Sequence, residues 1–236
     1  MNLKESNPIE ILEYAVANKL VFAYMKKKHN ARMVFDPTYP EIDETRFQAQ
    51  DWSNTYGNVK EAIPLNAPEP LGKAVVLQCY VDADHAADKP TRRSRTGILI
   101  FLNMAPITWF LKRQNSVETS TFGSEFFCAC KAATEMCRGL RYKCHMMGIP
   151  LDGPGYMYCD NNSVVCNTTM LPESTLNKKK SNSIAACHCV REAVVAMGEM
   201  ISTYEPTETN ISDLMTKALP GGARQTTLVR RILYDI

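Results

Sequence analysis

The sequence predicts an α/β fold in which helices flank a mixed sheet of five strands. Runs of apolar and β-branched residues that end in polar turn residues indicate the strands, at 75–82, 96–102, 107–111, 157–160 and 201–204. The first three runs follow one another through short connections, which predicts antiparallel pairing. A long helical pattern precedes the fourth run, so this strand is expected to lie beside the first and parallel to it.

A long helix is predicted between the third and fourth strands because apolar residues recur there every three or four positions. Gly148 and Pro150 end this helix after about seven turns. Shorter helices are predicted after a cap at Asn161, over residues 183–197, and around Asp213. The apolar stripe of the long helix consists of Phe122, Phe126, Cys130, Ala133, Cys137, Leu140, Cys144 and Met147.

Composition places the chain among ordinary globular proteins rather than membrane or secreted ones. Its 236 residues suffice for one sizeable core, and 45% hydrophobic with 22% charged residues is typical of such a core. No apolar run reaches membrane-spanning length, and the polar residues 1–6 do not resemble a signal peptide. Nine scattered cysteines, an odd number, indicate a reducing compartment. We therefore expect a cytoplasmic or nuclear protein.

Four segments are expected along the chain. The first contains a helix that begins at Asn7 and Pro8 and a short strand at Val34 and Phe35. The second is rich in proline and polar residues without periodicity, which is typical of a linker. The third carries the five strands, and the fourth is a basic tail that follows them. Their bounds are 1–36, 37–74, 75–220 and 221–236.

Four carboxylates stand where a metal site would need them. Asp82 and Asp160 end the first and fourth predicted strands, Glu125 lies near the start of the long helix, and Asp213 lies in the last short helix. Carboxylates at strand ends point out of a rigid sheet edge. If all four converge, they form a cage of hard oxygen ligands, which suits Mg²⁺ and phosphate chemistry. We expect Asp213 to be the most displaced, because its helix is short and follows a loop.

Three of these carboxylates also have a plain structural interpretation, whereas Asp82 at the end of a buried strand has only a weak one. Glu125 in a first helical turn is favoured by the helix dipole, Asp160 could cap the next helix, and a first-turn aspartate such as Asp213 is common. Asp84 shares the side-chain parity of Asp82 along the strand, but a turn residue is the simpler interpretation of it. The metal interpretation therefore depends on the four residues occurring together.

A series of sequence blocks in fixed order carries a family resemblance. The blocks are Tyr80–Asp88, Arg92–Gly97, Pro106–Trp109 with Lys112–Gln114, Ser120–Phe126, Cys159–Asn161, Lys178–Lys180, His188–Glu192 and Ile211–Lys217. Over residues 75–220 they resemble the ribonuclease H domain of copia-like retrotransposon polyproteins. Ala31–Pro37 looks like the tail of the reverse transcriptase that precedes such a domain. The chain would then be a fragment that begins after the polymerase.

The resemblance implies a ribonuclease H-like fold and a metal-dependent endonuclease. In such an enzyme Asp82, Glu125, Asp160 and Asp213 would hold two Mg²⁺ ions, with Mn²⁺ as a possible substitute. The substrate would be an RNA–DNA hybrid, of which the RNA strand is cut, and the polymerase portion of the parent polyprotein would be a partner. The resemblance and the local sequence also suggest groove or phosphate contacts for Ser120, Asn161, Asn162, Lys178, Lys179 and Lys180, and an auxiliary position for His188.

A second class of function remains open. The same fold without turnover would be a silent or domesticated remnant that at most binds nucleic acid through its basic runs. Departures from the family pattern at His85, Ser181 and Ala218 fit such a divergent copy, although none of them removes a predicted metal ligand. Intact carboxylates favour the enzyme, whereas the expected loss of the polymerase favours the remnant.

Overall fold

A mixed five-stranded sheet forms the centre of the molecule. The computed structural model describes residues 19, 21–47, 51–169 and 197–234. The strand order is β4-β3-β2-β5-β6, with β2 antiparallel to β3 and parallel to β5. The predicted fold class is thereby confirmed, including the position of the fourth predicted strand beside the first. The strands are β2 (Leu77–Asp84), β3 (Arg95–Leu102), β4 (Ala105–Arg113), β5 (Gly155–Cys159) and β6 (Met200–Tyr204).

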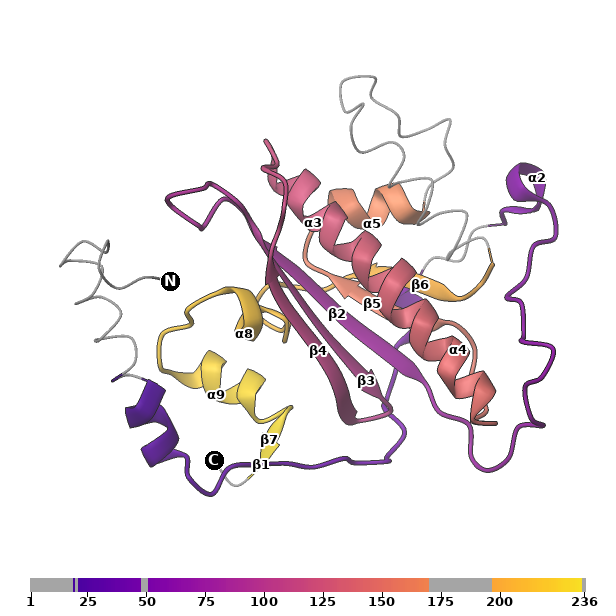
Figure 1. Cartoon of the computed structure of the whole chain (residues 1–236), viewed down its shortest axis with the longest axis horizontal. Coiled ribbons are helices and arrows are strands. Elements are labelled where there is room, and N and C mark those ends of the chain that lie inside the picture. Colours follow the sequence, from indigo (N-terminus) through magenta and orange to yellow (C-terminus); the bar gives the residue numbers. More distant parts are fainter. Residues whose placement is uncertain (1–18, 20, 48–50, 170–196, 235–236) are drawn as a thin grey trace.

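Helices cover both faces of this sheet. In Figure 1 the helices α3 and α4 lie along one face, and α8 and α9 lie on the other side. The helix α5 follows β5 and packs beside β6. The bounds are α3 (Thr121–Cys130), α4 (Arg138–Met146), α5 (Asn162–Thr169), α8 (Asp213–Thr216) and α9 (Ala223–Val229).

The long helix departs from the prediction in its middle and at its end. A π-helical segment, η2 (Lys131–Cys137), joins α3 to α4. Periodicity does not predict it, since a π segment is an extra residue inserted into an otherwise regular helix. Met147, assigned to the buried stripe, is 63% exposed because the helix ends one residue before it. Of the other stripe residues whose burial is described, Phe122, Phe126, Cys137 and Cys144 are buried, as predicted, and Leu140 is partly buried.

The alternation of side chains along β2 divides the core into two halves. Leu77, Cys79 and Val81 belong to the cluster that packs beneath α3, which also contains Phe126. Tyr80, on the opposite face, belongs to a second cluster with residues of β3, β5 and α9. Because β2 is central and buried on both faces, its direction and register determine where its C-terminal carboxylate emerges.

The segment predicted as a linker contains η1 (Glu44–Arg46) and α2 (Ser53–Tyr56). Its residues 42–47 lie against the second face of the sheet, where Phe47 packs on the second core cluster. The Arg46 guanidinium lies 2.7 Å from the Glu205 carboxylate, and Thr203 Oγ1 donates a hydrogen bond of 2.7 Å to the Arg46 carbonyl. These contacts attach residues 42–47 to β6 and to the residue that follows it.

The two ends of the described chain meet in a small second sheet. The strand predicted at Val34 and Phe35 instead lies at β1 (Arg32–Met33), where it pairs with β7 (Leu233–Tyr234). Pairing with a distant partner sets this position, which local sequence cannot reveal. The predicted helix start at Asn7 and the helix at 183–197 lie outside the described residues. Among the described residues, no helix is both long and apolar enough to cross a membrane.

A charged cluster joins the segment before the sheet to α4. Two guanidinium nitrogens of the buried Arg141 donate to the Glu61 carboxylate at 2.9 and 2.5 Å, and His145 Nε2 lies 3.1 Å from Glu61 Oε1. Burial alone would raise the pKa of Glu61. Hydrogen bonds and attraction from Arg141, and then from His145, outweigh burial, so the pKa of this carboxyl is lower than its ordinary value.

Replacing Glu61 with Gln should therefore destabilise the fold in a pH-dependent way. At pH 7 we expect a loss of about 1–2 kcal/mol, because charge-assisted hydrogen bonds are lost from a partly buried site. The ionised Glu61 contributes above the unfolded pKa, about 4.3, and its contribution disappears as pH falls through the lower folded value. Urea unfolding at several pH values measures this, with exposed Glu69→Gln as control. A difference between wild type and Glu61→Gln that stays constant with pH would contradict it.

Candidate metal centre

The parallel strands β2 and β5 bring Asp82 and Asp160 together. Tyr80 pairs with Tyr158, and the next residues, Val81 and Cys159, also pair. One step further the same register sets Asp82 beside Asp160, on the face where the rings of Tyr80 and Tyr158 stack with centroids 4.6 Å apart. Both carboxylates therefore emerge at the same edge of the sheet, as predicted, although β2 continues past Asp82 to Asp84 and does not end at Asp82.

Asp213 completes a group of three carboxylates. One oxygen each of Asp82, Asp160 and Asp213 lies within 4.8 Å of the others. The loop before α8 is attached to the sheet by Asn210, whose Nδ2 donates to the Val81 carbonyl at 3.0 Å and whose Oδ1 accepts from the Ser212 hydroxyl at 2.6 Å. Contrary to our expectation, Asp213 is fully buried within the group, because this anchoring compensates for the shortness of its helix.

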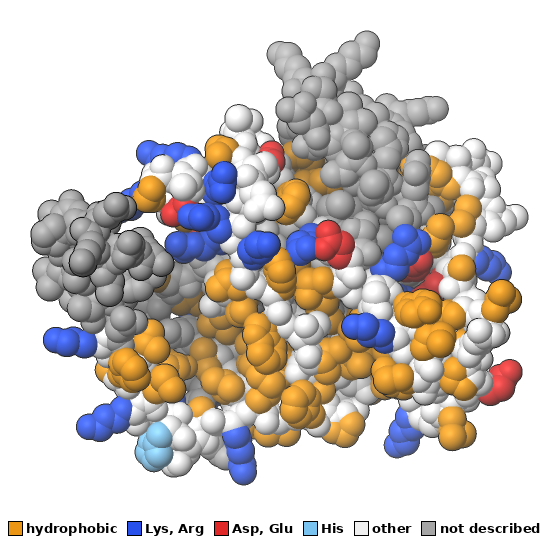
Figure 2. All heavy atoms as spheres, in the orientation of Figure 1, with side chains coloured by type: hydrophobic (Ala, Val, Ile, Leu, Met, Phe, Trp, Pro, Cys, Tyr) orange, Lys and Arg blue, Asp and Glu red, His pale blue; other side chains and the backbone are white. Residues whose placement is uncertain are grey.

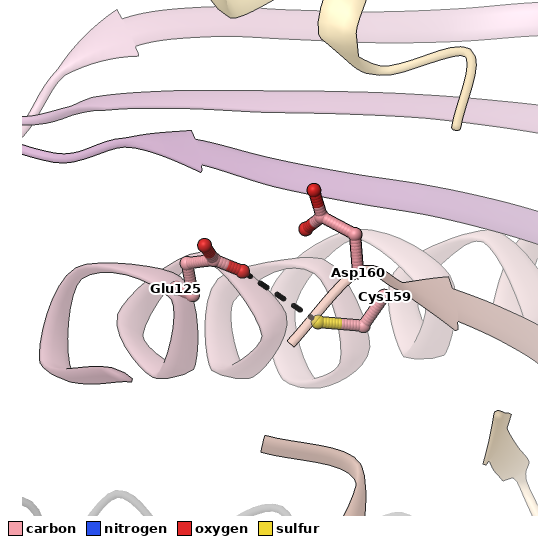
Figure 3. Close-up of side chains that lie close together, drawn as sticks. All are labelled: Glu125, Cys159 and Asp160. Carbon is pink, nitrogen blue, oxygen red and sulfur yellow. Dashed lines mark hydrogen bonds between the residues drawn. The ribbon is translucent and has the colours of Figure 1, made fainter. Parts of the chain in front are cut away.

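Glu125 approaches the three aspartates from α3, which lies on the opposite face of the sheet from α8 (Figure 1). The Ser120 hydroxyl caps α3 by accepting from the Gly123 amide at 3.1 Å, so the helix starts at Thr121, four residues before Glu125. Potential ligand atoms of Glu125, Cys159 and Asp160 lie within 4.8 Å of one another. Figure 3 shows the Glu125 carboxylate beside the end of β5, where Asp160 and Cys159 emerge. Asp160 is thus common to both groups and links Glu125 to the other aspartates.

Two basic side chains contact this acidic cluster. Lys217 Nζ lies 2.6 Å from Asp213 Oδ1, 3.2 Å from Asp82 Oδ1 and 3.7 Å from Asp160 Oδ2. The Arg224 guanidinium, from α9, is paired with the other oxygen of Asp213. Removing Lys217 would take the shared cation from three buried carboxylates, which is destabilising, whereas Asp213 would keep Lys217 if Arg224 were removed.

The cluster raises the pKa of two of its carboxyl groups. Burial, partly opposed by a hydrogen bond from Thr216 and the charge of Lys217, raises the pKa of Asp82 to about 6. Burial, followed by the charges of Asp160 and Asp82, raises the pKa of Glu125 to about 9. Both shifts mean that negative charge in this space is costly without a cation, and they are typical of functional sites.

The donor set fits a hard divalent cation. The four residues that the sequence predicted as ligands all carry carboxylates, and oxygen ligands suit Mg²⁺ or Mn²⁺. Asp160 Oδ1 is buried and accepts no hydrogen bond within the described part of the chain, which is the position expected of a metal ligand. Burial raises the pKa of the Cys159 thiol well above its usual range, so its sulfur remains protonated and is a poor ligand.

Gly97 permits α8 to approach the sheet closely. A Cβ at this position of β3 would lie 2.5 Å from Thr216 Cγ2 and 3.0 Å from Met215 Cβ. The Thr216 hydroxyl donates a hydrogen bond to Asp82 Oδ2, so the close approach also orients the central carboxylate. The missing side chain of Gly97 is therefore part of the site geometry.

The remaining predicted contact residues have structural roles where they are described. Asn161 Oδ1 accepts from the amides of Ser163 and Val164 at 2.9 and 3.3 Å, which confirms its predicted helix cap. Ser120 caps α3, and Asn162 is exposed at the start of α5. None of these contacts tests the predicted nucleic-acid role of Ser120, Asn161 and Asn162, which stays a prediction. Lys178, Lys179, Lys180 and His188 lie outside the described residues.

Sequence reasoning missed the residues that hold the carboxylates in place. Lys217 follows Asp213 by four positions, a helical spacing that could have indicated the ion pair. The roles of Asn210, Thr216 and Arg224 depend on the contact between α8, α9 and the sheet, and no local pattern indicates it. Gly97 lies within a strand, where an isolated glycine indicates a close approach of another backbone, and this signal was available.

Comparison with known proteins relates the chain to transposon polyproteins. It is 28% identical over 157 residues, 65% of its length, to the retrovirus-related Pol polyprotein from transposon RE1 of Arabidopsis thaliana. Similar stretches of 151 and 150 residues match the Pol polyproteins from transposon RE2 of the same plant (27% identical) and transposon TNT 1-94 of Nicotiana tabacum (28%). The matched part spans 10–11% of the length of these polyproteins. No protein-family model matches the chain.

Replacing Gly97 with Ala should disturb the site through α8. The added methyl group must displace Thr216 and Met215, so we expect a loss of about 1–3 kcal/mol of stability and weaker binding of Mn²⁺. Denaturant unfolding and metal titration measure the two effects. Gly139→Ala is the matched control, because a Cβ there meets open space within α4 and should be neutral or stabilising. Equal metal binding by the Gly97 and Gly139 variants would contradict this role of Gly97.

Proposed function

We propose that the chain is the ribonuclease H-type module of a retrotransposon Pol polyprotein, a metal-dependent endonuclease that cuts the RNA strand of RNA–DNA hybrids. The observation that carries the proposal is the meeting of Asp82, Glu125, Asp160 and Asp213 at one edge of the sheet. These four come from two strand ends and two helices that are far apart in sequence. The similarity to transposon Pol polyproteins supports the coarser part of the proposal, that the chain is a piece of such a polyprotein.

The acidic cluster supports phosphodiester hydrolysis through bound divalent ions. Mg²⁺ or Mn²⁺, when bound, would supply an activated water nucleophile and stabilise charge on the leaving oxygen. Asp82, Asp160 and Asp213 would hold the ion-binding space from the sheet side, and Glu125 would close it from α3. Burial of these carboxylates keeps their oxygens fixed, which fits a reaction that depends on positioning.

A basic surface beside the cluster fits the phosphates of a hybrid. Lys112, Arg113 and Lys131 line a shallow cavity of about 120 Å³ between β4 and α3. Gln114, which also lines it, donates a hydrogen bond of 2.9 Å to the carbonyl of Ser124, the residue before Glu125. Figure 2 shows Lys and Arg side chains across this face of the molecule, with Asp and Glu side chains among them. Arg113 and Lys131 are themselves paired with Asp88 and Glu135. Such contacts position nucleic acid without reading its sequence, and the 2′-hydroxyl groups would identify the RNA strand.

The competing function is a catalytically silent module that binds nucleic acid. The basic surface alone would serve such a module as well as an enzyme. The buried, unpartnered oxygen of Asp160 favours the enzyme, because a module that only binds phosphates has no use for a costly buried carboxylate. The polymerase portion of a Pol polyprotein is the expected partner in either case.

Replacing Asp160 with Asn should separate cleavage from binding. The amide keeps the size of the side chain but removes the charge that a metal needs, so cleavage of a labelled hybrid in Mg²⁺ should fall by orders of magnitude. Hybrid affinity should persist or increase, because a carboxylate that repels phosphates is gone. Gel analysis of cleavage and fluorescence anisotropy of binding measure the two effects.

The control for this experiment is Asp152→Asn, which removes a carboxylate that contacts Tyr39, away from the cluster. It should cut and bind as the wild type does. If the wild-type protein binds hybrids in Mg²⁺ but does not cut them, the chain is the silent module and not the enzyme. Wild-type protein that neither binds nor cuts would contradict both functions for the isolated chain.

Replacing Lys178, Lys179 and Lys180 together with Ala should have the reverse effect. If these side chains neutralise phosphates, hybrid binding weakens and the slope of log affinity against log salt concentration falls by up to about 3. Divalent-ion binding should be unchanged, because the carboxylates are intact. Anisotropy titrations between low and moderate salt measure the slope, and an unchanged slope would exclude these lysines from the interface.

A further inference from the structure

Lys217 occupies the middle of the acidic cluster rather than its border. It follows α8, and its backbone amide donates to the Asp213 carbonyl at 2.9 Å, which fixes the start of its side chain. From there its ammonium lies within 3.7 Å of an oxygen of each of Asp82, Asp160 and Asp213. The side chain is 36% exposed, whereas those of the three carboxylates are between 0 and 6% exposed.

Arg224 differs from Lys217 in what it reaches. Its guanidinium contacts one oxygen of Asp213 and the backbone carbonyls of Thr207 and Glu208. It therefore attaches α9 to the base of the cluster and holds a single carboxylate. Lys217 is the described cation that reaches all three aspartates.

The position of the ammonium coincides with the space in which the carboxylate oxygens would hold a divalent ion. The three aspartate oxygens lie within 4.8 Å of one another, which is too close for an ammonium and a metal ion to share fully. A lysine ammonium is a compact charge on a flexible four-carbon stem, so it can leave the cluster without a change in the backbone.

We propose that Lys217 is a built-in counter-ion of this cluster, which stabilises the three aspartates and competes with the divalent ion for the space between them. This inference rests on the proposed function in one respect, namely that a divalent ion binds there. It predicts two opposite effects of removing the ammonium. Stability without metal should fall, because three buried carboxylates lose their shared cation, and affinity for the metal should rise, because the competitor is gone.

The test uses the whole chain and the variants Lys217→Met, Lys217→Gln and Lys143→Met. Met and Gln keep much of the side-chain length but remove the charge, and exposed Lys143, at the far end of α4, is the matched control. Calorimetric titration gives the affinity for Mn²⁺, and thermal unfolding in EDTA and in excess Mn²⁺ gives the stability. For both Lys217 variants we expect an affinity increase of about tenfold or more and a Tm several degrees lower in EDTA that Mn²⁺ restores.

The outcomes distinguish this inference from the proposed function. If the Lys217 variants bind Mn²⁺ as the wild type does, or more weakly, competition between Lys217 and the divalent ion is excluded, whereas the proposed metal site is supported. If neither wild type nor variants bind a divalent ion, the proposed metal site fails and the inference fails with it. Should a Lys217 variant unfold in EDTA, refolding on addition of Mn²⁺ supports the proposal, and failure to refold in Mn²⁺ overturns it.

Discussion

The parallel pairing of β2 with β5 is the constraint on which the candidate site depends. In this register Tyr80 stacks on Tyr158, and the carboxylates two residues further along each strand are neighbours. A shift by one residue would move Asp82 to the opposite face and bury a charge beneath α3. The apolar residues of β2 that pack against α3 prevent this shift, so the hydrophobic core and the carboxylate cluster require the same register.

Burying several carboxylates together lowers the stability of the fold, and contacts from other parts of the chain offset this loss. Asp82 and Asp213 are buried among like charges, and each depends on cations from the chain's C-terminal region. Lys217 and Arg224 supply these charges, while Leu228 of α9 packs into the second core cluster and holds that helix on the sheet. We therefore expect the C-terminal region to fold together with the acidic cluster, because buried carboxylates are destabilising without the cations that this region supplies.

The sheet and the four carboxylates could be predicted because their signals are local. Both carboxylates stand in a Tyr-X-Asp pattern near the end of an apolar run, at Tyr80–Asp82 in β2, which continues to Asp84, and at Tyr158–Asp160, directly after β5. The π segment at Lys131–Cys137 could not be predicted, since an extra residue in a helical turn leaves the spacing of the apolar stripe nearly unchanged. The contacts of residues 42–47 and the pairing of β1 with β7 were equally invisible, because each depends on a partner more than a hundred residues away.

These long-range contacts explain how the four carboxylates are held together at one edge of the sheet. Asn210 attaches the α8 loop to the carbonyl of Val81, and Gly97 lets α8 lie against β3. Neither residue needs to contact a substrate, yet together they determine the position of Asp213 relative to Asp82. The geometry of the four carboxylates therefore depends on neutral residues as much as on the acidic ones. A divergent copy of this sequence could retain every carboxylate and still lose the site through a change at Gly97 or Asn210.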